Sequence, residues 1–327
     1  MTSNQIVPSW KTFDIPAHSR RAIISIGNFD GVHEGHKNLI TQMKTLGKTI
    51  SQPPAPIVAI TFYPHPLLIL RPGINLSFLS TLEQKKKLLH AAGADYVAVL
   101  KTDDGLLELQ AEEFFEKIIF ETFKAQGIVE GPDFHFGKNR TGNIDLLKEL
   151  CLTRNIVGTI ATPFLVDNEV VSSSRVRKAI QTGDMLQAKK LLGRTYSIEG
   201  KVVSGAKRGR TIGFPTANLE NIQTLLPMNG VYAALCNIGN KTFATAVNIG
   251  PNPTFSELSQ KVEAHLLDFE GDLYDQTIEI NFLEKIRSVK TFVDKNALVQ
   301  QLELDIQQTR HLVFADNPEF FNKRNPV

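Results

Sequence analysis

Short apolar runs alternate with segments of helical spacing through the first half of the chain. The runs have the length of β-strands, and they are 22–26 (AIISI), 57–62 (IVAITF), 96–100 (YVAVL) and 128–130 (IVE). Two helical faces are predicted between them, made of Leu39, Ile40, Met43 and Leu46, and of Phe114, Phe115, Ile118, Ile119 and Phe123. This alternation predicts a parallel, Rossmann-like α/β sheet with both helical faces packed on it.

The pattern changes from about Thr195 to successive strand-like stretches joined by turns that contain Gly, Pro and Asn. These stretches are 196–203 (YSIEGKVV), 231–239 (VYAALCNIG), 241–249 (KTFATAVNI), 262–269 (VEAHLLDF) and 276–284 (QTIEINFLE). They predict an all-β barrel or sandwich. Helical spacing returns between Asp294 and Leu312, through Leu298, Leu302 and Ile306, and predicts a helix that closes the barrel.

A chain of 327 residues is longer than one average domain, and the change of pattern predicts two domains. Between the two patterns, the segment 173–194 predicts two short helices broken at Gly183, with Asp184 as the cap of the second. We place the boundary within 186–194, which gives domains of residues 1–186 and 187–327. The sequence contains no internal repeat or low-complexity tract, so duplication does not explain the two halves.

Composition narrows the classes of partner. The 36 basic and 34 acidic side chains leave a formal charge of +2, too small to indicate nucleic acid as the main partner. Cys151 and Cys236 lack the spacing of a zinc site or a redox pair. The N-terminus has no charged start followed by an apolar stretch, and no apolar run reaches a membrane-spanning length. We therefore expect a cytoplasmic protein without a membrane or nucleic-acid partner, and no oligomer is predicted.

The run GNFDGVHEGH (27–36) follows the first predicted strand and opens onto the first predicted helix. In a parallel α/β sheet this places it at the carboxyl ends of the strands, where ligands gather. Its glycines allow the backbone to approach phosphate closely, the helix start offers free N–H groups, and His33 and His36 can donate hydrogen bonds to phosphate oxygens. The candidate nucleotide-binding residues of the loop are Gly27, Asn28, Phe29, Asp30 and Gly31.

This run resembles the H-x-G-H signature of the nucleotidyltransferase superfamily, and the preceding Asp30-Gly31 is similar to the prokaryotic FAD synthetase branch. In that family the two histidines steady the α-phosphate of ATP while the phosphate of FMN attacks and pyrophosphate leaves. The resemblance implies these roles for His33 and His36. Such a transfer depends on positioning and charge stabilisation and needs no covalent nucleophile. The alternative, that the histidines are loop or helix-cap residues, is weakened by the strand, glycine loop and helix around them.

Three further polar segments follow apolar runs, and we expect them at the same edge of the sheet. They are 61–66 (TFYPHP), 131–143 (GPDFHFGKNRTGN) and 171–177 (VSSSRVR). By resemblance, Ser173, Ser174 and Arg177 match a family segment that contacts ATP phosphates at a helix start, where the helix dipole favours anions. The alternative for 175–178 is a solvated basic helix face.

The segment 131–143 also contains a family element that lies near the nucleotide and flavin pockets. Asp133, Phe134, Phe136 and Gly137 match this element by resemblance. Of these, Asp133 and Phe134 are the candidate binding residues. For His65, a turn residue held between prolines is the favoured interpretation.

A second cluster of polar chemistry lies in the predicted β domain, between residues 205 and 218. It combines a glycine-rich loop, three cations and a turn led by proline. The loop can cradle phosphates, and the Thr216 hydroxyl and the Asn218 amide oxygen are hard ligands suited to a partly hydrated Mg²⁺ ion. The candidate ATP-binding residues are Gly205, Lys207, Arg210, Gly213, Pro215, Thr216 and Asn218.

The string Pro215-Thr-Ala-Asn218 resembles the P-T-A-N signature of riboflavin kinases, and the resemblance extends through 230–233 (GVYA), 248–255 (NIGPNPTF) and 265–275 (HLLDFEGDLYD). It implies that Thr216 and Asn218 bind Mg-ATP and that Glu263 is the general base for the 5′-hydroxyl of riboflavin. An alcohol that attacks the γ-phosphorus must lose its proton, and a positioned carboxylate assists that step. Without the motif, Glu263 would be an ordinary charge on the solvent face of a strand, and 207–210 a solvated hairpin tip.

Two positions depart from the family pattern. Asp275 follows Tyr274 where the family has glycine, and Lys37 stands where the adenylylating branch has glutamine. Neither departure affects an assigned catalytic group.

Together the resemblances imply an enzyme of flavin biosynthesis with two activities. The β domain would phosphorylate riboflavin with Mg-ATP to FMN, and the α/β domain would transfer AMP from ATP to FMN, giving FAD and pyrophosphate. Two alternatives stay open at this point: one of the two activities has been lost, or the chain is a flavin- or RNA-binding regulator that uses the basic segments 175–178 and 207–210.

Overall fold

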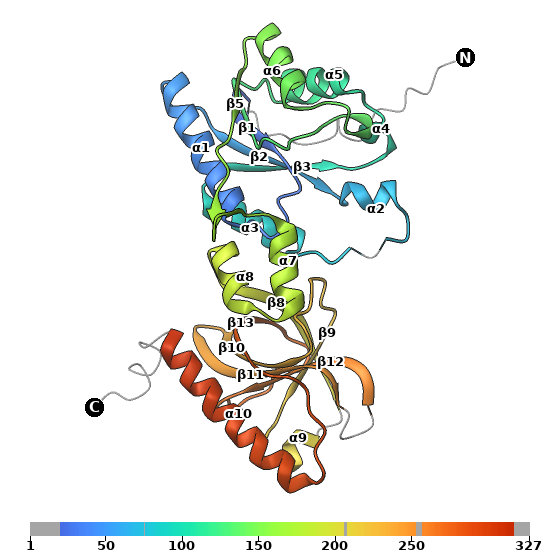
Figure 1. The fold of residues 1–327 in the computed structure, drawn as a ribbon, viewed down its shortest axis with the longest axis vertical. Helices are drawn as coiled ribbons and strands as arrows, with labels where there is room; N and C mark the ends of the chain where they lie inside the picture. Colours follow the sequence, from blue (N-terminus) through green and yellow to red (C-terminus); the bar gives the residue numbers. More distant parts are fainter. Residues whose placement is uncertain (1–19, 75, 206–207, 253–256, 317–327) are drawn as a thin grey trace. The chain divides into compact units, whose positions relative to one another are not determined.

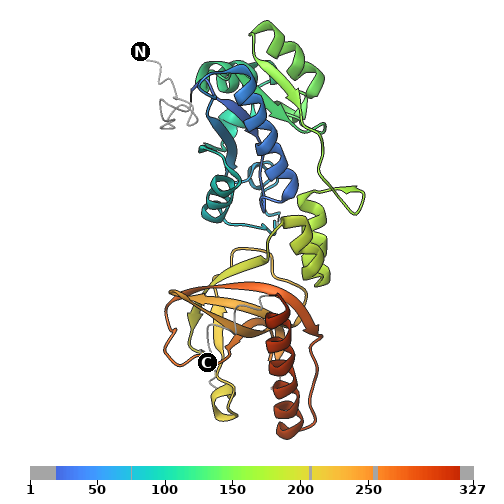
Figure 2. The same ribbon diagram turned by 90° about the vertical axis from the view of Figure 1, so that its left-hand side faces the viewer.

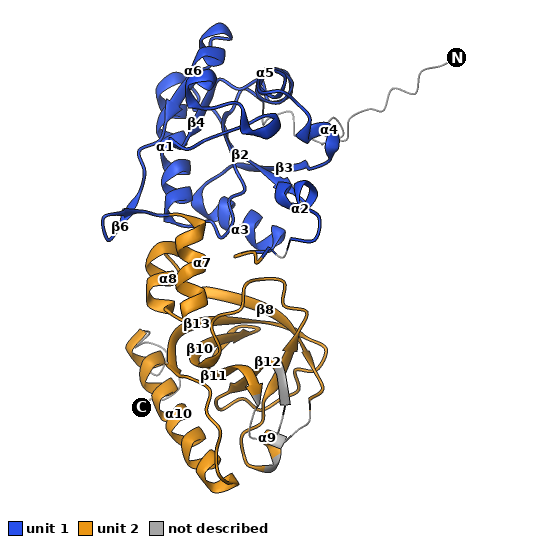
Figure 3. Cartoon of the chain, turned by 45° about the vertical axis from the view of Figure 1, so that its right-hand side comes forward, with its two compact units in different colours: residues 1–76, 80–171 blue, residues 77–79, 172–327 orange. Residues whose placement is uncertain are grey.

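The protein is described by a computed structural model, which covers residues 20–74, 76–205, 208–252 and 257–316. It divides into two compact units, coloured separately in Figure 3. The first comprises Met1–Leu76 and Ser80–Val171, and the second comprises Ser77–Leu79 and Ser172–Val327. This division by contacts places 172–186 with the second unit, and the boundary expected between residues 186 and 187 stays a prediction. Among the helices of the described ranges, none is both long and apolar enough to span a membrane.

The first unit is built on a parallel sheet of five strands in the order β3-β2-β1-β4-β5 (Figure 1). Its strands are β1 (Ile23–Ile26), β2 (Ile57–Tyr63), β3 (Tyr96–Lys101), β4 (Gly127–Glu130) and β5 (Val157–Ile160). The sequence predicted the first four. It gave no signal for β5, because this edge strand is mostly exposed and lacks a buried apolar run. The predicted parallel α/β sheet is therefore confirmed.

Helices cover both faces of this sheet. On one face, α1 (Glu34–Ile50) packs against β1, β2 and β4, and α3 (Leu82–Ala92) packs against β3 and α1; Ile40, Met43 and Leu89 belong to the core cluster of this face. On the other face lie α5 (Ala111–Phe114), the π-helical segment η3 (Phe115–Thr122) and α6 (Ile144–Thr153), which belong to a second core cluster. The two predicted apolar faces pack on opposite sides of the sheet.

Short elements complete the first unit. They are α2 (Pro66–Leu70), α4 (Asp104–Leu107), η4 (Lys138–Arg140), and a hairpin of β6 (Leu165–Val166) and β7 (Glu169–Val170).

The second unit begins with the helix pair predicted for 173–194. α7 (Ser173–Thr182) ends at Gly183, which has a φ of 77°, and α8 (Met185–Leu192) follows directly. The carboxylate of Asp184 accepts the N–H of Gln187 at 2.9 Å, so it caps α8 as predicted.

A closed, antiparallel six-stranded barrel follows, in the order β10-β11-β12-β9-β8-β13 (Figure 2). Its strands are β8 (Tyr196–Val203), β9 (Ala217–Glu220), β10 (Gly230–Ile238), β11 (Lys241–Asn252), β12 (Glu257–Leu266) and β13 (Thr277–Arg287), with the short helix α9 (Arg208–Thr211) between β8 and β9. Because the strands form a closed ring, the domain is the predicted barrel and not the alternative sandwich. Strand β9 was not foreseen because its four residues lie inside a motif rich in turn-forming residues.

The predicted closing helix is α10 (Lys295–Asp316), which packs on the outside of the barrel. Its most buried residues are Asp305, Thr309 and Val313, and the predicted Leu298 and Leu302 are half-buried. The predicted apolar residues lie on the packed face, and this face also contains a buried carboxylate. Apolar spacing alone does not find such a position.

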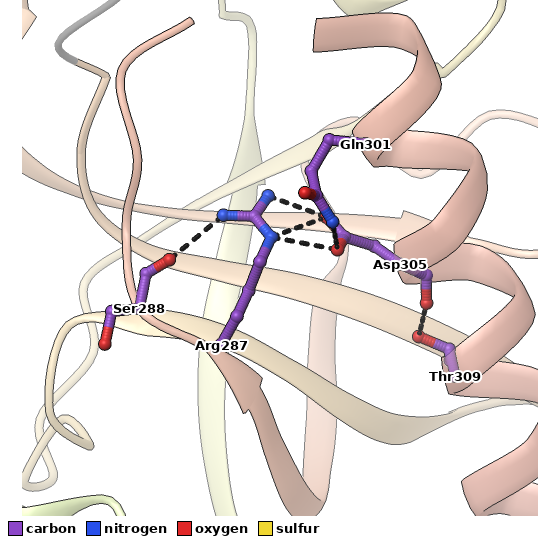
Figure 4. A network of polar contacts seen from close by, with 5 residues as sticks. All are labelled: Arg287, Ser288, Gln301, Asp305 and Thr309. Carbon is purple, nitrogen blue, oxygen red and sulfur yellow. Dashed lines mark hydrogen bonds and ion pairs between the residues drawn. The ribbon is translucent and has the colours of Figure 1, made fainter. Parts of the chain in front are cut away.

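The carboxylate of Asp305, which is 2% exposed, receives the guanidinium of Arg287 from β13 (Figure 4). Nε donates to Oδ1 at 2.9 Å and Nη2 donates to Oδ2 at 2.7 Å, so the contact is bidentate. The Gln301 side-chain amide also donates to Oδ1 at 2.9 Å, and the Thr309 hydroxyl donates to the Asp305 carbonyl at 2.8 Å. This network fixes α10 on the barrel.

Replacing Asp305 with leucine leaves the Arg287 guanidinium buried without a counter-ion, so the free energy of unfolding should fall by about 3 kcal/mol. In the double variant Arg287→Met/Asp305→Leu most of that loss should be recovered, because no charge is then buried. Asp268→Asn is the control: Asp268 pairs with Arg310 of α10 on the surface, and asparagine tolerates the φ of 58° at this position, so the change should cost less than about 1 kcal/mol. Urea unfolding measures all three, and equal losses at the two aspartates would contradict the assignment.

Candidate active sites

The first candidate site begins where the central strand β1 parts from β4. The two strands pair through Ile23 with Gly127 and Ile24 with Ile128. Two residues further on, the N–H of Ile26 donates to a side chain, Oε1 of Glu130, at 2.7 Å. Strand order reverses between β1 and β4, and ligands of open α/β sheets bind at the carboxyl ends of strands beside such a reversal. The loop 27–33 leaves the sheet at this point.

The loop is held in a strained conformation by its surroundings. Phe29 and Val32 have φ angles of 46° and 41°, and Gly31 has a φ of 77°. Such backbone in residues other than glycine persists only where neighbouring groups fix it. The N–H of Gly31 donates to Ser80 Oγ at 3.1 Å, and the N–H of Ser80 donates to the buried carboxylate of Asp30 at 3.3 Å. The loop is therefore anchored to the start of α3.

His33 and His36 lie together at the N-terminus of the 17-residue helix α1. Their rings stack with centroids 3.7 Å apart and planes 15° from parallel, and the ring of Phe29 meets His36 edge-on at 5.1 Å. A Cβ at Gly35 would lie 3.2 Å from the ring of His33, so glycine gives the stack its room. The predicted pair is thus adjacent, at a helix end suited to anions.

The environment of His36 favours its neutral form. Burial lowers its pKa well below the usual value, and the charges of His33 and Lys85 act in the same direction. Its Nδ1 is buried and accepts no hydrogen bond from the residues that the structure describes. A neutral imidazole offers one N–H donor, which is what a phosphate oxygen accepts.

Sequence reasoning missed a set of buried polar side chains beneath this loop. They are Ser25, Thr61, Ser80, Lys85 and Glu130. The ammonium of Lys85, on α3, donates to Thr61 Oγ1 at 3.3 Å; burial lowers the pKa of Lys85, and Asp30 opposes that shift. Thr61 lies in the predicted segment 61–66, but it had been given no role of its own. The sequence does not distinguish Lys85 from its neighbours Lys86 and Lys87. Glu130 is the last residue of a predicted apolar strand, and no role was assigned to it.

The segment after β4 combines packing residues with an exposed carboxylate. The ring of Phe134 stacks on Phe136 with centroids 5.5 Å apart, and Phe136 is buried. A Cβ at Gly137 would lie 2.6 Å from the backbone of Ala111, so only glycine fits there. Asp133 is exposed. Of the matched residues, Phe136 and Gly137 shape the loop, and Asp133 and Phe134 remain the candidates for ligand contact.

His65 is a cap of α2, where its Nδ1 accepts the N–H of Leu67 at 3.1 Å. This is the turn role favoured from the sequence.

Ser173, Ser174 and Arg177 lie in the second unit, in the first turns of α7, as the sequence predicted for a helix start. Ser172 caps this helix and accepts the N–H of Arg175 at 3.4 Å. Nε of Arg177 donates to the carbonyl of Ser77 at 3.1 Å.

The second candidate site is a row of polar residues on the barrel. Asn218 of β9 pairs with Glu263 of β12, and Glu263 pairs with Asn248 of β11. Their strand neighbours Leu219, Val262 and Ala264 are buried, so the row lies on the outer face of the barrel. Asn248 had been noted only as the first residue of a motif, and the register brings it to the site.

Glycines bring the loop before β9 against this row. A Cβ at Gly205 would lie 2.2 Å from Nδ2 of Asn218, and one at Gly209 would lie 2.2 Å from the carbonyl of Phe214. Nδ1 of His265 donates to the carbonyl of Pro215 at 2.7 Å, which holds the turn before Thr216. Gly213 has a φ of 90°, and Arg210 is exposed. Lys207 lies outside the described residues.

An open cavity of about 240 Å³ lies at this end of the barrel. Of the predicted residues, Gly205 and Asn218 line it, and they are joined by Val203, Ser204, Leu219, Glu220, Gln260, Lys261 and Val262. Among His, Cys, Asp and Glu residues of the described segments, no group of three or more is placed to hold a metal ion.

Family models match the two halves separately. One described as FAD synthetase matches residues 15–175, and one described as riboflavin kinase matches residues 192–313. A bifunctional riboflavin kinase/FMN adenylyltransferase of Buchnera aphidicola subsp. Schizaphis graminum is 36% identical over 288 residues, 87% of this chain and 91% of that protein. The chain belongs to the bifunctional riboflavin kinase/FMN adenylyltransferase family. The family member of Escherichia coli strain K12 is 32% identical over 306 residues, 93% of this chain and 94% of that protein.

A solved structure shares the fold. It is described as a macrolide-efflux protein from Streptococcus pneumoniae, and it is 30% identical, with a TM-score of 0.83 over 92% of this chain and 97% of that chain. The word efflux describes that protein only. The structural similarity supports the presence of an α/β unit and a barrel unit in one chain. The predicted family, fold class and pair of activities are confirmed, and the roles of individual site residues stay predictions.

The low pKa of His36 can be tested directly by NMR. Its ring C–H signal should stay in the neutral state well below the pH at which an ordinary histidine, with a pKa of about 6.5, titrates. Lys85→Met removes a nearby positive charge and should raise the His36 midpoint. Lys87→Met, an exposed lysine of the same helix, should leave it unchanged. A wild-type His36 midpoint in the ordinary range would contradict the described environment.

Proposed function

We propose that this chain carries out two successive ATP-dependent steps at two separate sites. The barrel unit transfers the γ-phosphate of ATP to riboflavin and forms FMN. The α/β unit then transfers AMP from a second ATP to FMN, forming FAD and releasing pyrophosphate. The position of the two motifs carries the proposal. The motif 27–36 lies beside the reversal of strand order in the parallel sheet, where ligands of such sheets bind. The motif 215–218 ends beside the paired polar residues Asn218 and Glu263 on the barrel.

For adenylyl transfer, the loop 27–31 and the helix start at Glu34 cradle the phosphates of ATP through backbone N–H groups. His33 and His36 donate to the α-phosphate and stabilise the charge that develops as the phosphate of FMN attacks. A neutral His36 still has one N–H to donate, so its buried environment is compatible with this role. Ser173, Ser174 and Arg177 stay proposed ligands of ATP phosphate on the motif they match, and Asp133 with Phe134 orient the nucleotide or flavin.

For riboflavin phosphorylation, Glu263 accepts the proton of the 5′-hydroxyl as that oxygen attacks the γ-phosphorus. Its strand position holds the carboxylate beside Asn218 without a flexible loop. Gly205, Lys207, Arg210, Gly213 and Pro215 form the loop that encloses the phosphates of ATP.

We further propose Mg²⁺ as the metal of this site. The hydroxyl of Thr216 and the amide oxygen of Asn218 are hard ligands, and the side chain of Asn218 fits against Gly205 where any Cβ would displace it. When bound with ATP, the ion would neutralise charge on the transferred phosphoryl group.

The described cysteines, Cys151 and Cys236, are both free thiols, in keeping with the expected cytoplasmic location.

The two sites should be separable by mutation. Glu263→Gln removes the proton acceptor and should lower FMN formation from riboflavin at least about 100-fold, while FMN-to-FAD conversion continues. His36→Ala should do the reverse and lower only FAD formation. Each variant is supplied with either riboflavin or FMN, ATP and Mg²⁺, and the flavins are separated chromatographically while ADP and pyrophosphate are measured.

Glu279 provides a matched control for Glu263, since it is also a half-buried glutamate of a barrel strand, but lies on β13, which pairs with β8 and β10 and not with β12. Glu279→Gln should keep both activities. Loss of both activities in a folded Glu263→Gln protein would overturn the assignment of separate sites.

A further inference from the structure

Glu130 is a buried carboxyl group at the first candidate site to which no role has been assigned. It ends strand β4 and is 3% exposed. Its Oε1 accepts the N–H of Ile26 at 2.7 Å, and its Oε2 lies 3.4 Å from the hydroxyl of Ser25. Both contacts are to β1, immediately before the loop that carries the histidine pair.

These contacts provide a hydrogen-bond acceptor for a backbone N–H that lies beyond the end of the β1–β4 ladder. The β1–β4 ladder covers Ile23 and Ile24, and the N–H of Ile26 lies beyond it. The next N–H, that of Gly27, donates to the other neighbour, Ile60 of β2, at 2.9 Å. A buried N–H without an acceptor costs roughly 1–3 kcal/mol. The side chain of Glu130 therefore supplies the last rung of the β1–β4 ladder.

The position of this rung determines what it controls. Ile26 is followed directly by Gly27, and the strained loop residues Phe29, Gly31 and Val32 come next. Fixing the amide of Ile26 sets where the loop leaves the sheet, and thus where His33 begins α1. Shifts of about 1 Å at a transferring phosphorus can cost 100-fold in rate.

The surroundings favour the neutral acid. Burial raises the pKa of Glu130 well above its usual value, against the opposing effect of the Ile26 and Ser25 hydrogen bonds. In the described residues no lysine, arginine or histidine forms an ion pair with it. A neutral carboxyl keeps one carbonyl oxygen for Ile26, so glutamine reproduces both its shape and its acceptor.

We infer that Glu130 is a positioning residue for adenylyl transfer, which fixes the end of β1 and with it the histidine-bearing loop. The inference rests on the proposed transfer of AMP at this site. It predicts that kcat for FAD formation depends on an acceptor at position 130, while the KM for FMN and the riboflavin kinase activity do not.

The test compares Glu130→Leu with Glu130→Gln in the full chain. The leucine variant keeps the volume and loses the acceptor, so kcat for FMN-to-FAD conversion should fall about 10- to 100-fold. The glutamine variant should stay within about 3-fold of wild type, because the acceptor remains. Ile128→Val is the control for packing loss in the same buried strand and should leave kcat unchanged. Riboflavin kinase activity in each preparation reports that the chain is folded.

The outcomes separate the inference from the function it rests on. Absence of FAD formation by the wild-type protein would count against the proposed adenylyl transfer. Wild-type activity with an equally active Glu130→Leu variant would overturn the positioning role. A fall in kcat that glutamine fails to restore would also overturn it.

If the leucine variant does not fold, the pH dependence of stability provides a second test. A group whose folded pKa is raised keeps its proton in the native state while the unfolded chain releases it above about pH 4.3. Wild-type stability should therefore fall as pH rises from that value, more steeply than that of Glu130→Gln. Asp30, His33, His36 and Lys85, the other ionisable groups near this loop, are the same in both proteins, so their effects cancel in the difference. Parallel stability curves would contradict a neutral, anchoring carboxyl.

Discussion

The structure of the first site depends on a constraint at the end of β1. A central parallel strand must satisfy hydrogen-bonding groups on both sides, and here its neighbours diverge at its carboxyl end, with β2 on one side and β4 on the other. Gly27 bonds to β2 and Ile26 to the side chain of Glu130, so the chain leaves the sheet from a fixed point. The strained loop, the stacked histidines and the start of α1 all follow from that point. Backbone N–H groups and two imidazoles thereby gather at the N-terminus of α1, where we propose that the phosphates of ATP bind.

At the second site, strand register and not a loop determines where the polar side chains lie. A closed barrel has its backbone hydrogen bonds satisfied around the ring, so register alone sets which side chains share a face. Asn218, Glu263 and Asn248 form a row because β9, β12 and β11 are paired in that order. The glycine at 205 then lets the preceding loop approach Asn218 more closely than any side chain would allow.

The sequence predicted the elements whose apolar spacing is strong and the sites whose motifs are specific. It located β1 to β4, the helix pair of 173–194 and the barrel, and it identified both loops with their glycines. It did not find β5 or β9, since an exposed edge strand and a four-residue strand within a turn-rich motif lack a periodic signal.

The polar residues that sequence reasoning missed share one property: their importance comes from burial or from pairing across the chain. Lys85 is one of three consecutive lysines, Asp305 lies among apolar residues of a helix, and Glu130 ends an apolar strand. Each is explained by a contact distant in sequence, with Thr61, Arg287 and Ile26 respectively. Local pattern carries no information on such partners.

The central claim is that two sites use two ATP molecules in different ways, and position-specific labelling of ATP tests it most directly. With riboflavin as the starting flavin, FAD should acquire label both from ATP labelled at the γ-phosphate and from ATP labelled at the α-phosphate. With FMN as the starting flavin, only the α-label should enter FAD. Formation of FAD from riboflavin without incorporation of the γ-label would contradict the account.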